Sequence, residues 1–197
     1  RIFTTLDPWL QHATEKSVQQ HVSKLEKQAG YSKSELEAAA IITSVDGAEI
    51  RAMVGSRRVK YFGFNRALDA QRSIGSLAKP AVYLAALESG QYNWASILED
   101  KPVSVRGKDG STWRPKNYDK KDHGNVFMVD AMAQSLNQST ARLGMKVGLE
   151  KVLGTFKRLG IEKSISPYPS ILLGSMEMSP FEVTQMFQTY ASGGFSM

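Results

Sequence analysis

Residues 72–80 read RSIGSLAKP, and they combine a turn, a nucleophile and the start of a helix. Gly75 lets the chain turn sharply, because glycine adopts backbone conformations that other residues avoid. Pro80 is tolerated in the first turn of a helix, where its missing N–H group costs no hydrogen bond. The following residues are apolar on nearly every side. The stretch therefore predicts a buried helix over about 77–89, with Ser76 at its N-terminus.

Ser76 and Lys79 share one face of such a helix, so their side chains can meet. A Ser–Lys pair is an alternative to a His-dependent triad, provided that the amine is neutral and can accept the serine proton. A helix N-terminus and an apolar environment both disfavour a charged amine. The backbone N–H of Ser76 could stabilise an oxyanion. A Ser-x-x-Lys match arises readily by chance, and the alternative is a surface serine and lysine. The predicted apolar environment consists of Leu77, Ala78, Ala81 and Val82.

A second candidate element is Ser135-Leu136-Asn137, within a stretch that is helical in pattern from Val129 to Leu159. A second hydroxyl at Ser135 could relay a proton between the lysine and a leaving group. The Asn137 amide could bind a peptide carbonyl or hold Lys79. The alternative is that this tripeptide only caps a helix at a break between two helices.

The remaining pattern alternates helices with short strands. The first helix has a cap at Asp7 and Leu25 on its apolar face. The first strand of a predicted hairpin is apolar on both faces at its centre, which favours a place inside a larger sheet. The other predicted elements are a helix from Pro8 to Gly30, hairpin strands 39–45 and 49–54 around Asp46-Gly47, an irregular segment 100–125, and a helix from Ser179 to Gly193 with a capping box at Glu182.

The composition excludes several classes of site. The 197 residues contain no cysteine, which excludes disulfides, thiolate zinc sites and a cysteine nucleophile. His12, His21 and His123 lack metal-ligand spacing, so we expect no metal and no cofactor. The net charge is +6, which favours an anionic partner, but the basic residues are scattered, so we expect no nucleic-acid partner.

The two serine motifs resemble those of a known family. Ser-x-x-Lys and Ser-x-Asn are two of the three marker motifs of penicillin-binding proteins and serine β-lactamases. The chain is similar to the transpeptidase domain of class A, bifunctional penicillin-binding proteins, of the 1B type of Gram-negative bacteria. The stretches that carry the resemblance are FTTLDP at 3–8, GAEIRAMVG at 47–55, FNRA at 64–67, RSIGSLAKP at 72–80 and LLGS at 172–175.

The resemblance implies an α/β (α+β) fold of the penicillin-binding protein and serine β-lactamase type, with helices around an antiparallel sheet. It implies that Ser76 attacks the D-Ala-D-Ala carbonyl of a peptidoglycan stem peptide and that the acyl group passes to an amine of a neighbouring stem. Lys79 would be the base, Ser135 the proton relay and Asn137 a substrate-binding residue. β-Lactams would acylate Ser76. The implied location is the periplasmic face of the bacterial inner membrane, with other wall-synthesis proteins and an activator as partners.

One motif departs from the family pattern, because no lysine is followed by Thr-Gly or Ser-Gly. We expect residues 1–197 to be the N-terminal part of a single transpeptidase domain, incomplete and inactive by itself. A glycosyltransferase domain and a membrane anchor are expected upstream. Two alternatives stay open: a D,D-carboxypeptidase or β-lactamase of the same fold, and a non-catalytic penicillin-binding sensor domain.

Overall fold

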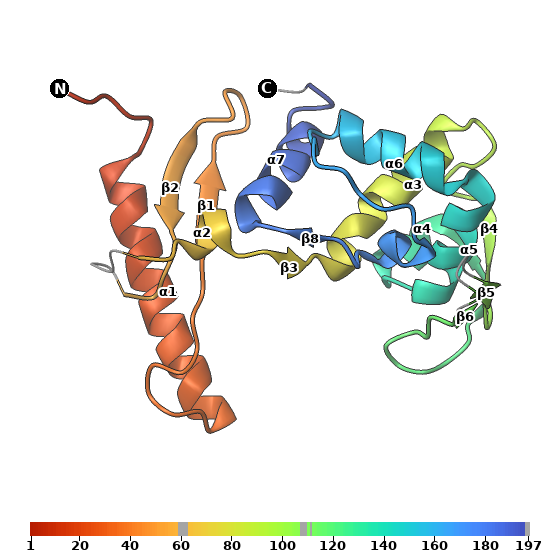
Figure 1. The fold of residues 1–197 in the computed structure, drawn as a ribbon, viewed down its shortest axis with the longest axis horizontal. Helices are drawn as coiled ribbons and strands as arrows, with labels where there is room; N and C mark the ends of the chain where they lie inside the picture. The colour runs from red at the N-terminus through yellow and green to blue at the C-terminus, as the bar shows by residue number, and fades with distance from the viewer. Residues whose placement is uncertain (59–62, 107–109, 111, 196–197) are drawn as a thin grey trace. The chain divides into compact units, whose positions relative to one another are not determined.

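The computed structural model describes residues 1–58, 63–106, 110 and 112–195, and it is mixed in helix and strand, as the expected α/β (α+β) class requires. The chain forms two compact units (Figure 1). The first unit comprises residues 1–72 and 178–197, and the second comprises residues 73–177. Strands β3 (Arg72–Ser73) and β8 (Glu177–Met178) contain the two points at which the chain passes from one unit to the other.

Helix α1 (Pro8–Ala29) begins and ends at the predicted residues of the first unit. The Asp7 carboxylate accepts hydrogen bonds from the backbone N–H groups of the first turn, and Gly30 closes the helix in the left-handed conformation. The predicted apolar face is wrong in part. Leu25 is 54% exposed, whereas Glu26 is buried. Glu26 is buried because it forms an ion pair with Arg57 from the segment after β2.

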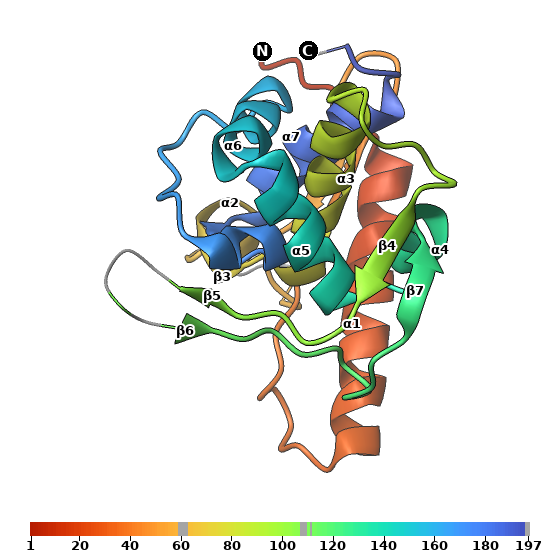
Figure 2. The same ribbon diagram turned by 90° about the vertical axis from the view of Figure 1, so that its right-hand side faces the viewer.

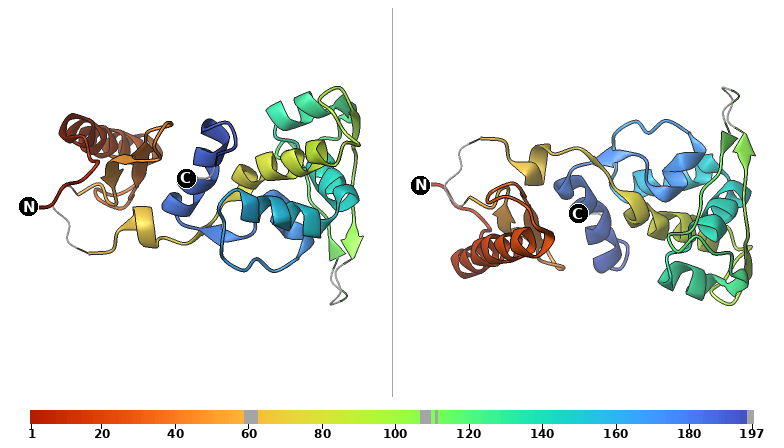
Figure 3. Two further views of the ribbon diagram at one scale, coloured as in Figure 1. Left: turned by 90° about the horizontal axis from the view of Figure 1, so that it is seen from above. Right: turned by 90° about the horizontal axis from the view of Figure 1, so that it is seen from below.

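The predicted hairpin is formed by β1 (Ala40–Thr43) and β2 (Ile50–Val54), which pair antiparallel. Among the described residues β1 pairs with β2 alone, so the larger sheet expected around β1 does not occur in this part of the chain. Helix α7 (Pro180–Ala191) packs on β1 and α1 packs on β2. Figures 1 and 3 show the hairpin between these two helices, which accounts for a strand that is apolar on both faces. Helix α7 has the predicted capping box.

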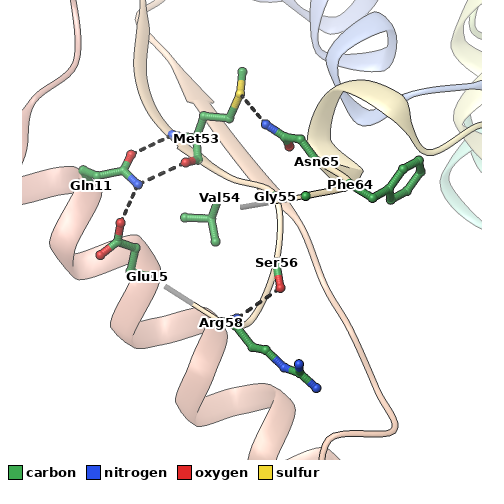
Figure 4. A pocket seen from close by; sticks show the side chains of 10 residues that line it. Gln11, Glu15, Met53, Val54, Gly55, Ser56, Arg58, Phe64 and Asn65 are labelled. Carbon is green, nitrogen blue, oxygen red and sulfur yellow. Dashed lines mark hydrogen bonds between the residues drawn. The ribbon is translucent and has the colours of Figure 1, made fainter. Parts of the chain in front are cut away.

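The outer edge of β2 is covered by a side chain of α1 (Figure 4). Gln11 Oε1 accepts from the Met53 N–H at 2.9 Å, and Gln11 Nε2 donates to the Met53 carbonyl at 3.0 Å. The amide thus replaces a neighbouring strand at this residue. A cavity of about 440 Å³ lies beside this contact, and Asn65 at the start of α2 (Arg66–Asp69) also lines it. Its lining includes none of the site residues predicted from the sequence.

Helix α3 (Lys79–Glu88) forms the centre of the second unit and begins two residues later than the predicted Leu77, because the 3-10 helix η1 (Gly75–Ala78) precedes it. Helices α5 (Asn137–Val147) and α6 (Leu149–Arg158) pack on it (Figure 2). The described residues of the segment 100–125 are largely irregular. Two short antiparallel pairs of strands lie in this segment or at its ends. These are β4 (Ile97–Asp100) with β7 (Gly124–Phe127), and β5 (Val105–Arg106) with β6 (Thr112–Trp113).

The stretch predicted to be helical from Val129 to Leu159 forms three helices, with breaks at Ser135 and at Gly148. Helix α4 (Met128–Ala133) ends before Ser135, which has a φ of +54°. Helix α5 ends at Gly148, whose φ of +102° interrupts the helical backbone. The break at Ser135 separates α4 from α5.

The segment before Ser76 is fixed by main-chain hydrogen bonds to the turn after the 3-10 helix η2 (Pro169–Leu173). The Gly75 N–H donates to the Gly174 carbonyl at 3.0 Å, and the Ile74 N–H donates to the Met176 carbonyl at 3.2 Å. A Cβ atom at Gly174 would lie 2.0 Å from the Gly75 carbonyl oxygen, so the two backbones approach too closely for any side chain. No helix of the described residues has the length and apolar character needed to cross a membrane.

Candidate active site

Ser76 lies at the surface, at the N-terminal end of a buried helix, as the sequence predicted. It is exposed and belongs to η1. Gly75 before it has a φ of +54°, which matches the predicted sharp turn. The Ser76 carbonyl accepts the backbone N–H of Lys79, so η1 runs into α3 without a gap.

The side chain of Lys79 is buried, with 2% of its surface exposed, and it brings two of the other predicted residues together. Its Nζ donates to the Ser135 carbonyl at 2.6 Å, to Ser135 Oγ at 2.9 Å and to Asn137 Oδ1 at 2.6 Å. Among the described residues Ser76 Oγ has no hydrogen bond to this amine, although the sequence predicted that the two could meet. The physical reason is that an ammonium has three protons, and all three are donated elsewhere.

Burial lowers the pKa of Lys79 from 10.5 to about 8, while the negative charge of Asp100 opposes this shift. The three acceptors around Nζ are neutral oxygens, and no ion pair of the described residues includes Lys79. With such a pKa, roughly a tenth of the amine is neutral at pH 7. Leu77 does not contribute to the predicted apolar environment, because it is 47% exposed. Leu77 is two residues from Lys79, and residues at that spacing do not share a helix face.

Ser135 presents two oxygens to Lys79 because its backbone is left-handed. Its φ is +54°, an uncommon conformation for a residue other than glycine. Its N–H bonds the Met132 carbonyl at 3.0 Å, which closes the last turn of α4 and leaves its own carbonyl and hydroxyl pointing to Nζ. Such a conformation costs on the order of 1 kcal/mol, so the surrounding contacts must maintain it.

Asn137 is the first residue of α5, and both ends of its side-chain amide are bonded. Its Oδ1 accepts from Lys79, and its Nδ2 donates to the Lys116 carbonyl at 2.8 Å. A primary amide has two N–H protons, so one remains for a ligand carbonyl. The sequence left two roles open for Asn137. In the structure its side chain holds Lys79, and its second N–H proton can still donate to a peptide carbonyl.

The sequence did not indicate a third cluster behind these residues. Asp100 is fully buried, and its carboxylate accepts from the Asn117 amide at 2.6 Å and from His123 Nδ1 at 2.8 Å. The folded structure brings these residues together. The pairing of β4 with β7 places Asp100 opposite Gly124, which follows His123 in the chain. His12 and His21, in contrast, are exposed on α1. Within the described residues no group of three or more acidic or histidine side chains could hold a metal ion.

Comparisons with known proteins agree with this arrangement. Residues 38–197 match the family model of the penicillin binding protein transpeptidase domain. The chain belongs to this family. It is 49% identical over 196 residues to penicillin-binding protein 1B of Vibrio cholerae, a match that covers 98% of this chain and 25% of that protein. It is 42% identical to penicillin-binding protein 1B of Escherichia coli K12, covering 98% of this chain and 23% of that protein.

Among solved structures, the fold is similar to that of the PonA1 protein from Mycobacterium tuberculosis in complex with penicillin V. The TM-score is 0.77 and the identity 26%, over 96% of this chain and 50% of that chain. The resemblance stated from the sequence, to penicillin-binding proteins of the 1B type, is therefore confirmed. The chain spans about a quarter of the length of these two relatives, and the roles of individual site residues in this penicillin-binding protein domain stay predictions.

Proposed function

We propose that this chain carries the nucleophile and the base of a peptidoglycan D,D-transpeptidase. Ser76 attacks the carbonyl of the penultimate D-Ala of a stem peptide and D-Ala leaves. An amine of a neighbouring stem then takes the acyl group from Ser76, which makes the cross-link. The observation that carries the proposal is the buried Lys79 amine, three residues after an exposed serine and bonded to both Ser135 and Asn137.

The amine can act as a base once it loses a proton. As an ammonium it donates to three oxygens, but a neutral amine has two protons and a lone pair. The lone pair accepts the Ser76 Oγ proton while Oγ bonds the substrate carbonyl carbon. Ser135 Oγ, 2.9 Å from Nζ, gives its proton to the nitrogen of the leaving D-Ala as the C–N bond breaks, and it takes the proton that Nζ received from Ser76 in its place. The reverse transfer serves the incoming amine, so no proton is gained or lost by the enzyme.

Two further hydrogen-bond donors, one from the backbone and one from a side chain, bind the substrate. The Ser76 N–H, at the start of η1, donates to the oxyanion that forms on the attacked carbonyl. The remaining Asn137 Nδ2 proton orients the substrate by donating to a peptide carbonyl. No metal or cofactor is assigned a role in this reaction.

A basic cavity supports an anionic peptide as substrate. It has a volume of about 430 Å³, and its lining includes three cationic side chains, Arg114, Lys116 and Lys120, against one carboxylate, Asp122. Lys116 is the residue whose carbonyl holds Asn137 Nδ2, so the cavity adjoins the site. Stem peptides carry carboxylates, which pair with such cations.

We further propose that residues 1–197 are the N-terminal part of one transpeptidase domain of a bifunctional synthase. In the full-length protein it acts at the periplasmic face of the bacterial inner membrane, with other wall-synthesis proteins and an activator as partners, and β-lactams acylate Ser76. This chain alone is inactive. Its similarity to penicillin-binding protein 1B of two Gram-negative bacteria supports this placement.

The test is the intact mass of the full-length protein after incubation with penicillin. We expect a stable adduct that is lost in Ser76→Ala and retained in Ser73→Ala, the neighbouring serine. Cross-linked product from lipid-linked peptidoglycan precursor then separates a transpeptidase from a sensor domain. Release of D-Ala without cross-links would indicate a D,D-carboxypeptidase, and absence of any adduct would contradict the proposal.

A further inference from the structure

A hydrogen-bond network behind the site joins Asp100 to the first turn of α5. The Asp100 carboxylate accepts from Asn117 Nδ2 at 2.6 Å, from His123 Nδ1 at 2.8 Å and from the Ser139 backbone N–H at 3.0 Å. His123 Nε2 lies 3.1 Å from Asp119. We call Asp100, Asn117 and His123 the Asp100 network. It holds a fully buried carboxylate without a direct contact to Lys79 among the described residues.

Asn117 is the link between this network and the site. Its Oδ1 accepts from the Asn137 N–H at 2.7 Å and from the Gln138 N–H at 3.2 Å. Its Nδ2 donates to Asp100 and, at 2.8 Å, to the Lys121 carbonyl. A flipped amide would point its N–H groups at two other N–H groups, so Asp100 and the helix together fix its orientation. The first residue of α5 lacks a side-chain cap of its own, and Asn117 supplies it from a distant loop.

We propose that Asn117, oriented by Asp100, is a positioning residue for the acyl-transfer site; this inference rests on the proposed function of Ser76 and Lys79. Asn137 is bonded on both sides: its N–H by Asn117, and its Oδ1 by Lys79. The location of Lys79 Nζ therefore depends on a backbone that Asn117 holds. A displacement of about 1 Å at such a group can cost on the order of a hundredfold in rate.

The network also acts on the lysine through charge. Asp100 raises the pKa of Lys79 against the effect of burial. Burial raises the pKa of Asp100 itself, but hydrogen bonds from His123, Ser139 and Asn117 outweigh it and hold that pKa below its usual value. The hydrogen bond to Asp100 raises the pKa of His123. The other titratable groups facing this region are Asp119, bonded to His123, and Tyr83, whose pKa burial raises to about 12.

The test compares Asn117→Ala with Asn125→Ala in the full-length protein. Asn125 lies on β7 of the same unit and is exposed, so it is the matched control. Penicillin acylation is resolved into the noncovalent dissociation constant and the acylation rate constant. We expect Asn117→Ala to lower the rate constant by about tenfold to a hundredfold with little change in the dissociation constant. We expect Asn125→Ala to match the unaltered protein.

A second variant covers the case in which Asn117→Ala does not fold. Asn117→Asp has the same shape and keeps the acceptor for α5, but it sets a second carboxyl against Asp100. Two such carboxyls share a proton at acid pH. We therefore expect the rate of Asn117→Asp, relative to the unaltered protein at the same pH, to rise as the pH falls, in samples shown to be folded by circular dichroism.

The outcomes separate the two proposals. If the unaltered protein forms no adduct at Ser76, the proposed function fails. If it forms the adduct and folded Asn117→Ala reacts at the same rate, with only a lower melting temperature, Asn117 is merely a helix cap and this inference is overturned. A pH-independent rate ratio for Asn117→Asp would overturn it in the same way.

Discussion

The two units each bury a charged side chain, but they treat the charge in opposite ways. In the first unit the Arg57 guanidinium contacts the Glu26 carboxylate directly, and Ser23 Oγ and the Leu36 carbonyl accept its other protons. In the second unit the Lys79 ammonium contacts only neutral oxygens. Its nearest compensating carboxylate, Asp100, is bonded instead to Asn117 and His123.

The difference separates a charge that supports the fold from a charge available for chemistry. Burial raises the pKa of Glu26, but the Leu36 N–H and Arg57 outweigh it and hold that pKa below 4.5, so the carboxyl stays ionised. The same burial, with no counter-ion in contact, lowers the pKa of Lys79 to about 8. A group that titrates near the working pH can exchange a proton, whereas a fixed ion pair cannot. The predictions below test this contrast.

The largest effect is expected for Lys79→Met. Removal of a general base lowers the rate by about 10²–10⁴-fold, so the acylation rate constant should fall by that factor. The melting temperature should change much less than for Arg57→Met, because the removal of an unpaired buried charge offsets the loss of the donor to three oxygens. Penicillin acylation and calorimetry of the full-length protein measure both quantities. Lys146→Met, at an exposed residue of α5, is the control. A large loss of stability in Lys79→Met would contradict the contrast.

The reverse result is expected for Arg57→Met. Glu26 is then left buried without its partner, and breaking a buried pair is strongly destabilising. We expect the melting temperature to fall by roughly 10 °C. The acylation rate constant of the folded protein should not change. Arg58→Met, at the exposed neighbour, serves as the control. An acylation defect in folded Arg57→Met would show that the ion pair is more than structural.

Local signals carried much of what the sequence could predict. Gly75, Pro80 and the apolar run after them specified the turn and the buried helix. Caps at Asp7 and Ser179 located the first residues of α1 and α7, whereas α7 ends at Ala191, before the predicted Gly193. These features depend on neighbours a few residues apart, and so a pattern can record them.

Partners far apart in sequence explain what was missed. Glu26 is buried in place of Leu25 because it pairs with Arg57. This partner lies 31 residues away, so the local pattern does not record it. The Asp100 network joins strands and a loop that only the pairing of β4 with β7 brings together. Ser135 interrupts a helical pattern because its backbone is left-handed, which directs its carbonyl and hydroxyl oxygens to Lys79. No periodicity encodes such long-range contacts.

A smaller effect is expected in the pH profile of acylation. Because burial lowers the pKa of Lys79 to about 8, the neutral base accumulates as the pH rises through that value. The acylation rate constant should therefore rise from pH 6 and level off above about pH 9. Asp100→Asn removes a charge that raises this pKa, so its profile should shift to lower pH, while Asp130→Asn, at an exposed residue of α4, should leave it unchanged. If the midpoint of the acylation profile lay near the ordinary lysine pKa of 10.5, Lys79 would not be a buried amine without a contacting counter-ion.

The smallest effect concerns the pH dependence of stability that Glu26 confers. Its pKa is lowered in the folded state, so its contribution is fully present above the ordinary value of 4.5 and is lost as the pH falls through the folded pKa. The difference in unfolding free energy between the unaltered protein and Glu26→Gln should be constant at neutral pH and shrink in acid. Denaturant unfolding at a series of pH values measures it, with Glu162→Gln as an exposed control. Lys79 should give a slope of the same sign in a different pH range: its lowered pKa makes the fold more stable as the pH rises from about 8 towards 10.5, and Lys79→Met should remove that rise. If both variants flattened the same pH range, the two buried charges would not differ as proposed.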